Sequence, residues 1–377
     1  MTRINRKRRT NSVQLNIAAD IGGSGLKAIY GGHDEKLESL FMEPEVISIP
    51  KTAIEDLYQD KLGNCQPEDA AWVGCHGKYV AVGYYAASRF YANAGLKELK
   101  YERGLYKILA CVWAIAQKLQ CSKSFKLNLA VLLPVGEYET RKKFEHNLRS
   151  LLKSYETPTG VMSVELGKFS SYPEGAGVFL LHSKASEIKH KKIAIAMIGY
   201  RNASVLISYR GVLDSGKTSD LGMVRMIDNL MSKTSGFSES KLCRSVVESG
   251  HDIHPAPLYK ITRTTTTASR NQEVTELVSA IKEAKALYLV SLISWLDNVI
   301  PYDVDEIIFC GGTVDYLKKD LNSHYRATPC IWHGGFTIPE VLDSYQLGSR
   351  LIDVYGAFLY FMSGLNITKS QRQEIVR

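Results

Sequence analysis

The chain has 377 residues, of which 45% are hydrophobic and 23% are charged, and its formal net charge is +8. This length and composition predict a globular protein of two or three domains with a sizeable core. No apolar run reaches the roughly 18 residues that a membrane span needs. The seven cysteines are scattered and form no Cys-x-x-Cys pair. We therefore expect a cytoplasmic protein without a zinc site or a disulfide framework.

Basic residues crowd the first ten positions of the chain: Arg3, Arg6, Lys7, Arg8 and Arg9. No apolar segment accompanies them, so the pattern is not that of a secretory signal. We expect residues 1–12 to form a disordered basic tail. It is either a solvated arm or a weak contact for DNA or another acidic surface.

A glycine-rich turn between two β-like segments follows. Residues 13–19 are apolar and β-compatible, Asp20 comes next, and a second β-like run begins at Leu26. This pattern predicts a strand, a tight turn and an antiparallel strand. Glycines leave backbone N–H groups free for phosphate oxygens, Asp20 suits the water shell of Mg²⁺, and Lys27 suits terminal phosphates. The alternative is an ordinary hairpin. In the phosphate-binding interpretation, the turn comprises Gly22, Gly23, Ser24 and Gly25.

The following residues alternate between strand and helix patterns. We expect strands at 46–49 and 71–73, two strands within 72–83, a core helix over 101–120, a buried strand over 127–136 and a basic helix over 140–153. His76 lies in the turn of the 72–83 segment, and we interpret it as structural because it has no acidic neighbour in sequence.

Residues 172–177 have the sequence Tyr-Pro-Glu-Gly-Ala-Gly. The proline fixes the entry to a helix, and the small residues let that helix begin close to other backbone. Glu174 therefore stands near a predicted helix start. An acidic side chain is favourable there for electrostatic reasons alone, so a catalytic and a local role both remain open.

The second half of the chain contains another hairpin and another glycine turn. Residues 192–198 and 204–209 read as paired strands, joined by Gly199, Tyr200, Arg201 and Asn202. Arg201 is either a phosphate contact or a solvated turn residue. Residues 306–314 read as a strand, a turn with Gly311, Gly312 and Thr313, and a helix.

The remaining expectations concern helix boundaries. Ser219 or Asp220 is expected to cap a helix, and Ser269 with Gln272 forms a capping-box signature for a helix over 273–299. We expect helix ends and exposed loops over 235–270, and a final helical stretch over 347–365.

Five segments of the chain resemble motifs of known proteins. Asp20, Gly22 and Lys27 match the first phosphate motif of the actin, Hsp70 and sugar-kinase superfamily, and residues 311–313 resemble its adenosine motif. Residues 173–177 resemble the Pro-Glu segment of bacterial actins, and the segments 133–138 and 219–222 resemble plasmid-segregation actins of the ParM/StbA type. The chain is thus identified by resemblance as a bacterial actin-like protein.

The resemblance implies an α/β, actin-like (ribonuclease H-like) fold with a nucleotide cleft between two domains. Domain I would comprise residues 13–172 plus 346–377, and domain II residues 173–345. It further implies ATP or ADP with Mg²⁺, which Asp20 would hold through water, and Glu174 as the residue that positions the attacking water. The remaining nucleotide contacts would be Gly22, Gly23, Ser24, Gly25, Lys27, Gly199, Tyr200, Arg201, Asn202, Gly311, Gly312 and Thr313.

The same resemblance implies filaments that move or anchor plasmid DNA through a DNA-binding adaptor of the ParR type, or that act as a cytoskeleton. One motif departs from the pattern, because Met197 stands at the usual aspartate and Asn202 at the usual threonine of the second phosphate motif. Hydrolysis is then either slow or supported by Asp20 and Glu174 alone. The alternatives are a nucleotide-sensing scaffold with little turnover and a sugar kinase, although no sugar-binding aspartate or Cys/His zinc cluster is evident.

Overall fold

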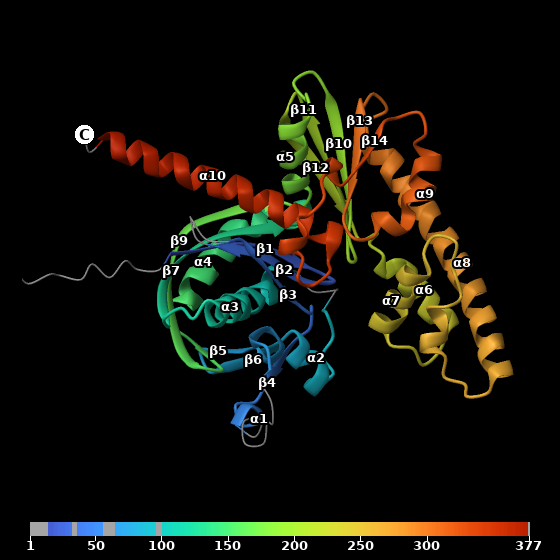
Figure 1. Ribbon diagram of the computed structural model, residues 1–377, viewed down its shortest axis with the longest axis horizontal. Helices are drawn as coiled ribbons and strands as arrows, with labels where there is room; N and C mark the ends of the chain where they lie inside the picture. Colours follow the sequence, from blue (N-terminus) through green and yellow to red (C-terminus); the bar gives the residue numbers. More distant parts are fainter. Residues whose placement is uncertain (1–13, 32–35, 56–64, 96–99, 376–377) are drawn as a thin grey trace, which may run out of the picture.

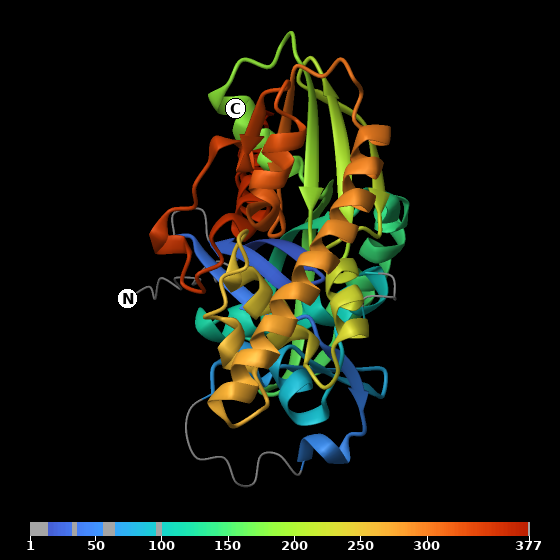
Figure 2. The same ribbon diagram turned by 90° about the vertical axis from the view of Figure 1, so that its right-hand side faces the viewer.

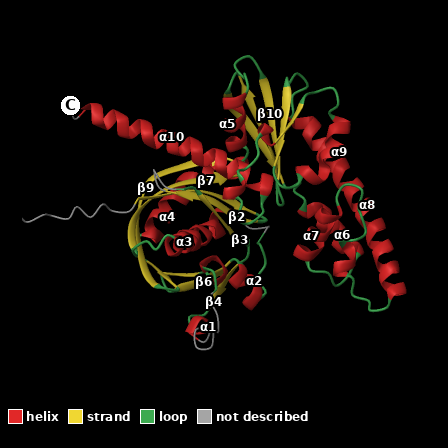
Figure 3. Ribbon diagram, viewed as in Figure 1, coloured by secondary structure: helices red, strands yellow, loops and turns green. Residues whose placement is uncertain are grey.

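The computed structural model describes residues 14–31, 36–55, 65–95 and 100–375 (Figure 1). Within these ranges, strands form one nine-stranded and one five-stranded sheet, and helices pack on both (Figure 3). The predicted α/β class is therefore confirmed. The predicted basic tail, residues 1–12, lies outside the described residues. No described helix has the length and apolar character needed to cross a membrane.

The nine-stranded sheet has the order β3-β2-β1-β7-β9-β8-β5-β6-β4. Its strands are β1 (Gln14–Gly22), β2 (Gly25–Gly31), β3 (Glu38–Met42), β4 (Val46–Ile49), β5 (Trp72–Cys75), β6 (Lys78–Val82), β7 (Ser124–Leu133), β8 (Tyr155–Thr157) and β9 (Gly160–Pro173). Its helical segments are α1 (Thr52–Glu55), η1 (Pro67–Ala70), α2 (Tyr84–Phe90), α3 (Lys100–Lys118), η2 (Val135–Thr140) and α4 (Arg141–Leu152).

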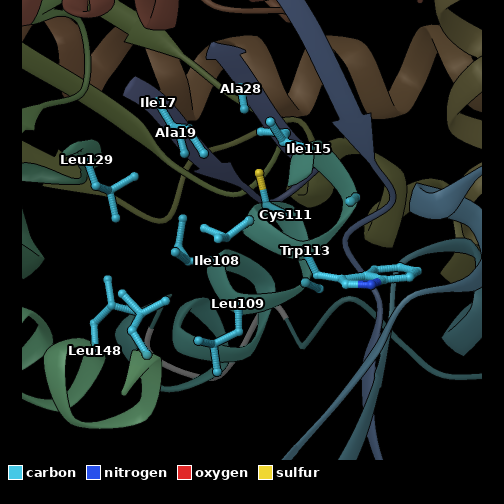
Figure 4. Packing of buried hydrophobic residues seen from close by; sticks show 14 of the residues in the cluster. Ile17, Ala19, Ala28, Ile108, Leu109, Cys111, Trp113, Ile115, Leu129 and Leu148 are labelled. Carbon is cyan, nitrogen blue, oxygen red and sulfur yellow. The ribbon is translucent and has the colours of Figure 1, made fainter. Parts of the chain in front are cut away.

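The sheet curves around α3 and α4, and a hydrophobic core lies between the sheet and these two helices (Figures 1 and 4). Side chains alternate across a strand, so Ile17 and Ala19 of β1 enter this core. Ala18 points to the opposite face, where it joins a cluster with α5 and α10. Asp20 lies two positions after Ala18, so its side chain lies on the same face of the strand. The strand period therefore directs this carboxylate away from the first core and toward α10.

The five-stranded sheet has the order β12-β11-β10-β13-β14. Its strands are β10 (Lys192–Ile198), β11 (Ala203–Tyr209), β12 (Val212–Ser219), β13 (Glu306–Cys310) and β14 (Cys330–Trp332). The helical segments that follow β9 in the chain are α5 (Ala176–Ala185), α6 (Val224–Lys233), α7 (Glu239–Ser249), η3 (Leu258–Ile261), α8 (Thr267–Val299), α9 (Val314–His324), η4 (His333–Gly335), η5 (Glu340–Leu342), η6 (Gly348–Leu351) and α10 (Ile352–Ile375). Of these, α10 packs against β1, β2 and β7 of the nine-stranded sheet. Helix α8 runs beyond the sheet and packs with α6 and α7 (Figure 2).

The two sheets repeat one topology. In the series β3-β2-β1-β7-β9, the first two pairings are antiparallel and the last two are parallel. The series β12-β11-β10-β13-β14 has the same four pairings in the same order. In each half, the antiparallel hairpin therefore lies next to a strand with which it pairs in parallel.

Helices α5 and α10 join the two halves by crossing at two glycines. A Cβ atom on Gly177 would lie 1.9 Å from the carbonyl oxygen of Asp353, and one on Gly356 would lie 2.1 Å from the carbonyl oxygen of Gly177. Only hydrogen atoms fit at this contact. The cluster around the crossing contains buried side chains from both sheets, including Ala18 of β1 and Ile195 of β10.

Several boundaries differ from the sequence-based expectations. Ser219 is the last residue of β12, and α6 begins at Val224 without a side-chain cap, so the predicted cap at Ser219 or Asp220 is wrong. Helix α8 begins six residues earlier than expected, where the hydroxyl of Thr266 accepts from the Ser269 amide. The segment 235–270 contains the ordered helix α7 with a buried apolar face. Strands β8, β9 and β12 were not predicted. Strand β8 has three residues and β12 is mostly polar, whereas β9 does alternate buried Met162, Val164 and Leu166 with polar residues, a signal that the sequence analysis missed.

Candidate functional site

The turn between β1 and β2 holds a buried ion pair. Asp20 and Lys27 are cross-strand partners in the register, and Lys27 Nζ donates to Asp20 Oδ2 at 2.5 Å. Both residues are nearly inaccessible, at 3% and 6% exposure. A Cβ on Gly22 would lie 2.8 Å from Lys27 Nζ, so glycine leaves the room that this lysine occupies. The structure thus brings together the predicted carboxylate, lysine and glycine of the first turn.

Arg350, which precedes α10, reaches the same turn. Its Nη2 donates to the carbonyl oxygen and to the hydroxyl oxygen of Ser24, both at 3.2 Å. Its guanidinium lies over the ring of Phe41, 5.5 Å from the centroid. Sequence analysis did not identify Arg350, because its contact with Ser24 spans 326 positions of the chain.

Glu174 lies between β9 and α5 and is 6% exposed. Its amide donates to the carbonyl of Leu133 at 2.9 Å, which places it beside the end of β7. Gly175 follows with φ of 92°, a left-handed conformation that favours glycine. This turn starts α5, as the sequence predicted.

Asp353 of α10 was also missed by the sequence analysis. Its carboxylate accepts from the amides of Gly175 and Gly177 at 2.8 Å and of Val178 at 3.2 Å, which satisfies N–H groups at the start of α5 that have no partner within the helix. Burial, together with the neighbouring charges of Asp20 and Glu174, raises the pKa of Asp353 to about 7, although the amide hydrogen bonds lower it. Three carboxylates from three elements are therefore close enough to interact.

The second hairpin places Met197 where the first places Asp20. Counting from the turns, Asp20 pairs with Lys27 two positions before the Gly22–Gly25 pair, and Met197 pairs with Ser204 two positions before Gly199 and Asn202. Met197 packs against the same cluster that Ala18 enters. The second hairpin thus presents a thioether and a hydroxyl in place of a carboxylate and an ammonium.

Side chains of the second turn are bound to other parts of the protein. Arg201 forms an ion pair with Glu137 of η2 at 3.3 Å, and its side chain is only 17% exposed, so the structure disagrees with a solvated arginine. The hydroxyl of Tyr200 donates to Glu239 at 2.6 Å. The Arg201 contact connects the two halves of the chain.

Hydrogen bonds join the second turn to the start of α6 and to the third turn, residues 311–313. The amides of Met223 and Val224 donate to the carbonyls of Gly199 and Tyr200, and the Thr313 hydroxyl donates to Gly199 at 3.0 Å. Gly311 has φ of 96°, and a Cβ there would lie 2.5 Å from the carbonyl oxygen of Ile198. Thr313 therefore ties these two turns together.

The donor set fits Mg²⁺ bound mainly by phosphate and water. The described residues contain no group of three His, Cys, Asp or Glu side chains arranged to hold a metal ion. Mg²⁺ commonly keeps several waters and uses one or two carboxylates plus phosphates. Asp20, at the end of β1 beside the glycine turn, provides one such carboxylate.

No protein-family model matches the sequence, and no curated protein sequence matches it. Its structure is similar to that of actin-like protein Alp7A, with a TM-score of 0.68 and 13% identity, covering 96% of this chain and 100% of the other. It is similar to ParM in a 15-stranded filament from Clostridium botulinum (TM-score 0.60, 14% identity, 93% and 99% coverage). It is also similar to Bacillus thuringiensis ParM with ATP (TM-score 0.59, 13% identity, 93% and 99% coverage). The predicted fold is confirmed: the chain has the actin-like fold of ParM and Alp7A.

Proposed function

We propose that this protein binds ATP or ADP with Mg²⁺ between its two halves and polymerises into cytoplasmic filaments. The carrying observation is the β1–β2 turn, where the buried Asp20–Lys27 pair lies beside three glycines in a chain of actin-like fold. The charges of Asp20 and Glu174 also act on the carboxyl group of Asp353. Similar structures have been solved as filaments and with ATP. The division into domain I (13–172 plus 346–377) and domain II (173–345) is part of this proposal.

Each group in the site has a role in this proposal. Glycine-turn amides bind the phosphates, Lys27 compensates their charge, and Asp20 orients water around Mg²⁺, which would supply electrostatic stabilisation of the phosphates. Glu174 orients the attacking water, a task that depends on position more than on basicity. The turns at 199–202 and 311–313 would border the nucleotide. Because Met197 provides no carboxylate, we propose that hydrolysis is slow.

The direct test is light scattering and negative-stain microscopy of the purified full chain with Mg²⁺ and ATP, with ADP and without nucleotide. We expect filaments with ATP. Filaments that form equally without nucleotide would contradict the ATP dependence, and glucose-dependent ADP production without filaments would favour a sugar kinase.

A second candidate function is a nucleotide-sensing scaffold, and Met197 is the observation that favours it. Such a protein would assemble with ATP while releasing almost no phosphate. Phosphate release measured during assembly separates the two candidates. In either case, we propose that the filaments act in plasmid segregation through a DNA-binding adaptor of the ParR type, or as a cellular scaffold.

A further inference from the structure

Three cations lie at or beside the first two turns, and their pairing differs. Lys27 has Asp20 at 2.5 Å, and Arg201 has Glu137 at 3.3 Å. Within the described chain, Arg350 forms no ion pair with any carboxylate. Its hydrogen bonds both go to Ser24, through one nitrogen. A guanidinium has five N–H donors, so most of its binding capacity is unused.

Arg350 is also partly buried. The missing side chain of Gly312 accommodates its stem, because a Cβ there would lie 3.2 Å from Arg350 Cγ. Burial lowers the pKa of the Arg350 guanidinium, while the charges of Asp20 and Asp343 raise this pKa from a distance. Both carboxylates are already engaged, Asp20 by Lys27 and Asp343 by the amides of Leu347 and Gly348. A charge that is partly removed from water is stabilised by a partner of opposite charge, so the surroundings favour an added anion.

The position of Arg350 indicates which anion this is. Its Nη2 lies 3.2 Å from the carbonyl oxygen of Ser24, in the turn whose amides would receive phosphate, and its stem contacts Gly312 in the third turn. A guanidinium forms planar, bidentate hydrogen bonds with phosphate. An anion in the first turn would therefore lie within reach of a group that the fold already holds there.

Resting on the proposed function, we propose that Arg350 binds the phosphate groups of the nucleotide and exchanges its hydrogen bonds to Ser24 for bonds to phosphate oxygens. Arg350 is thereby a direct ligand contact. It supplies a second positive charge to the phosphates. The first is that of Lys27, which also forms an ion pair with Asp20.

The test compares affinities of the full chain for ATP, ADP and adenosine by calorimetry, below the concentration at which it assembles. Arg350→Ala should weaken ATP and ADP binding by about 10- to 100-fold, as expected for a charged hydrogen bond. Adenosine affinity should change by less than about twofold, because adenosine carries no charge for the guanidinium to bind. Arg350→Lys should show an intermediate loss. The exposed Arg326→Ala makes the same charge change away from the site and should match wild type.

An unchanged ratio of ATP to adenosine affinity in Arg350→Ala would overturn the inference while leaving the proposed function intact. An equal loss for both ligands would also overturn it, since Arg350 would then support only the nucleoside pocket or the fold. If circular dichroism shows that the alanine variant is unfolded, the same ratio in Arg350→Lys decides. Wild type that binds none of the three ligands would overturn the proposed function together with this inference.

Discussion

The hairpins β1–β2 and β10–β11 hold equivalent places in two sheets of the same topology but carry different chemistry. In the first, Asp20 and Lys27 form a buried pair across the strands. In the second, Met197 faces Ser204, whose hydroxyl lies 3.0 Å from that of Thr218. The repeated topology therefore provides two comparable turn positions that differ in their side chains, and only the first has the charged pair on which the proposed phosphate site depends.

The second hairpin, in contrast, is connected by its turn to other parts of the chain. Arg201 pairs with Glu137 in the other half of the chain, and the turn carbonyls bind α6 and Thr313. We infer that the two hairpins have different roles: the first contributes charge to the site, and the second positions the two halves of the chain relative to each other. The following predictions test this difference between the hairpins, from the largest expected effect to the smallest.

Removing Asp20 should have the largest effect. Asp20→Ala leaves the buried Lys27 without its partner, which should lower the free energy of unfolding by about 3–5 kcal/mol, and it should abolish Mg²⁺-dependent ATP binding. Urea unfolding and calorimetry measure both effects. The double variant Asp20→Ala/Lys27→Met should regain much of the stability without regaining binding. Filaments of the single variant that form normally with Mg-ATP would contradict the role of Asp20.

Glu174→Ala should affect turnover rather than binding. We expect ATP binding and assembly to persist while phosphate release falls by about 100-fold, because water positioning matters mainly in the transition state. Phosphate release per filament is the measurement. Glu165→Ala removes an exposed carboxylate from β9 and serves as the control. Undiminished release in Glu174→Ala would show that another group orients the water.

Met197→Asp makes the second hairpin more like the first. If the two hairpins are equivalent, the new carboxylate should raise phosphate release by about tenfold at saturating Mg-ATP. Met197→Leu keeps the volume without adding a charge and should match wild type. Wild type that already turns over rapidly, with the aspartate variant slower, would make residue 197 a packing position. ATP binding should be measured with and without Mg²⁺, because repulsion from Asp20 and Glu174 would weaken it without the metal.

Asp353 should make stability depend on pH. Its folded pKa of about 7 exceeds the ordinary value of 3.8, so the folded state binds more protons between these values. The free energy of unfolding should therefore fall by an amount on the order of 1 kcal/mol or more as pH rises from 4 to 7. Asp353→Asn should reduce this slope, and the exposed Asp214→Asn should not. Parallel stability profiles of wild type and Asp353→Asn would contradict the assignment.

Deleting residues 1–10 should have the smallest effect. Assembly should be unchanged, and any binding to DNA should weaken and lose part of its salt dependence, because five basic residues are removed. Fluorescence anisotropy with labelled DNA over a salt series measures this. Identical binding curves for truncated and full-length protein would make the tail an inert arm.

Local sequence patterns were sufficient for the elements that surround the site. The apolar run ending at Asp20, the glycines after it and the Gly311–Gly312 pair predicted a hairpin and a strand–turn–helix unit that the structure contains. These features depend on near neighbours, since periodicity and turn chemistry act over a few residues. The same range explains the failure at β12, where pairing with β11 overrides a mixed polar pattern.

The site itself depends on contacts that no local pattern contains. Asp353 caps α5 from 178 positions away, Arg350 reaches Ser24 across 326 positions, and Arg201 finds Glu137 in the other half. Each partner is an ordinary charged residue in its own segment. Its role arises only in the folded chain, because burial decides which charges must be paired. Asp353, for example, acts at the α5–α10 crossing, where Gly177 and Gly356 let the two backbones come into contact.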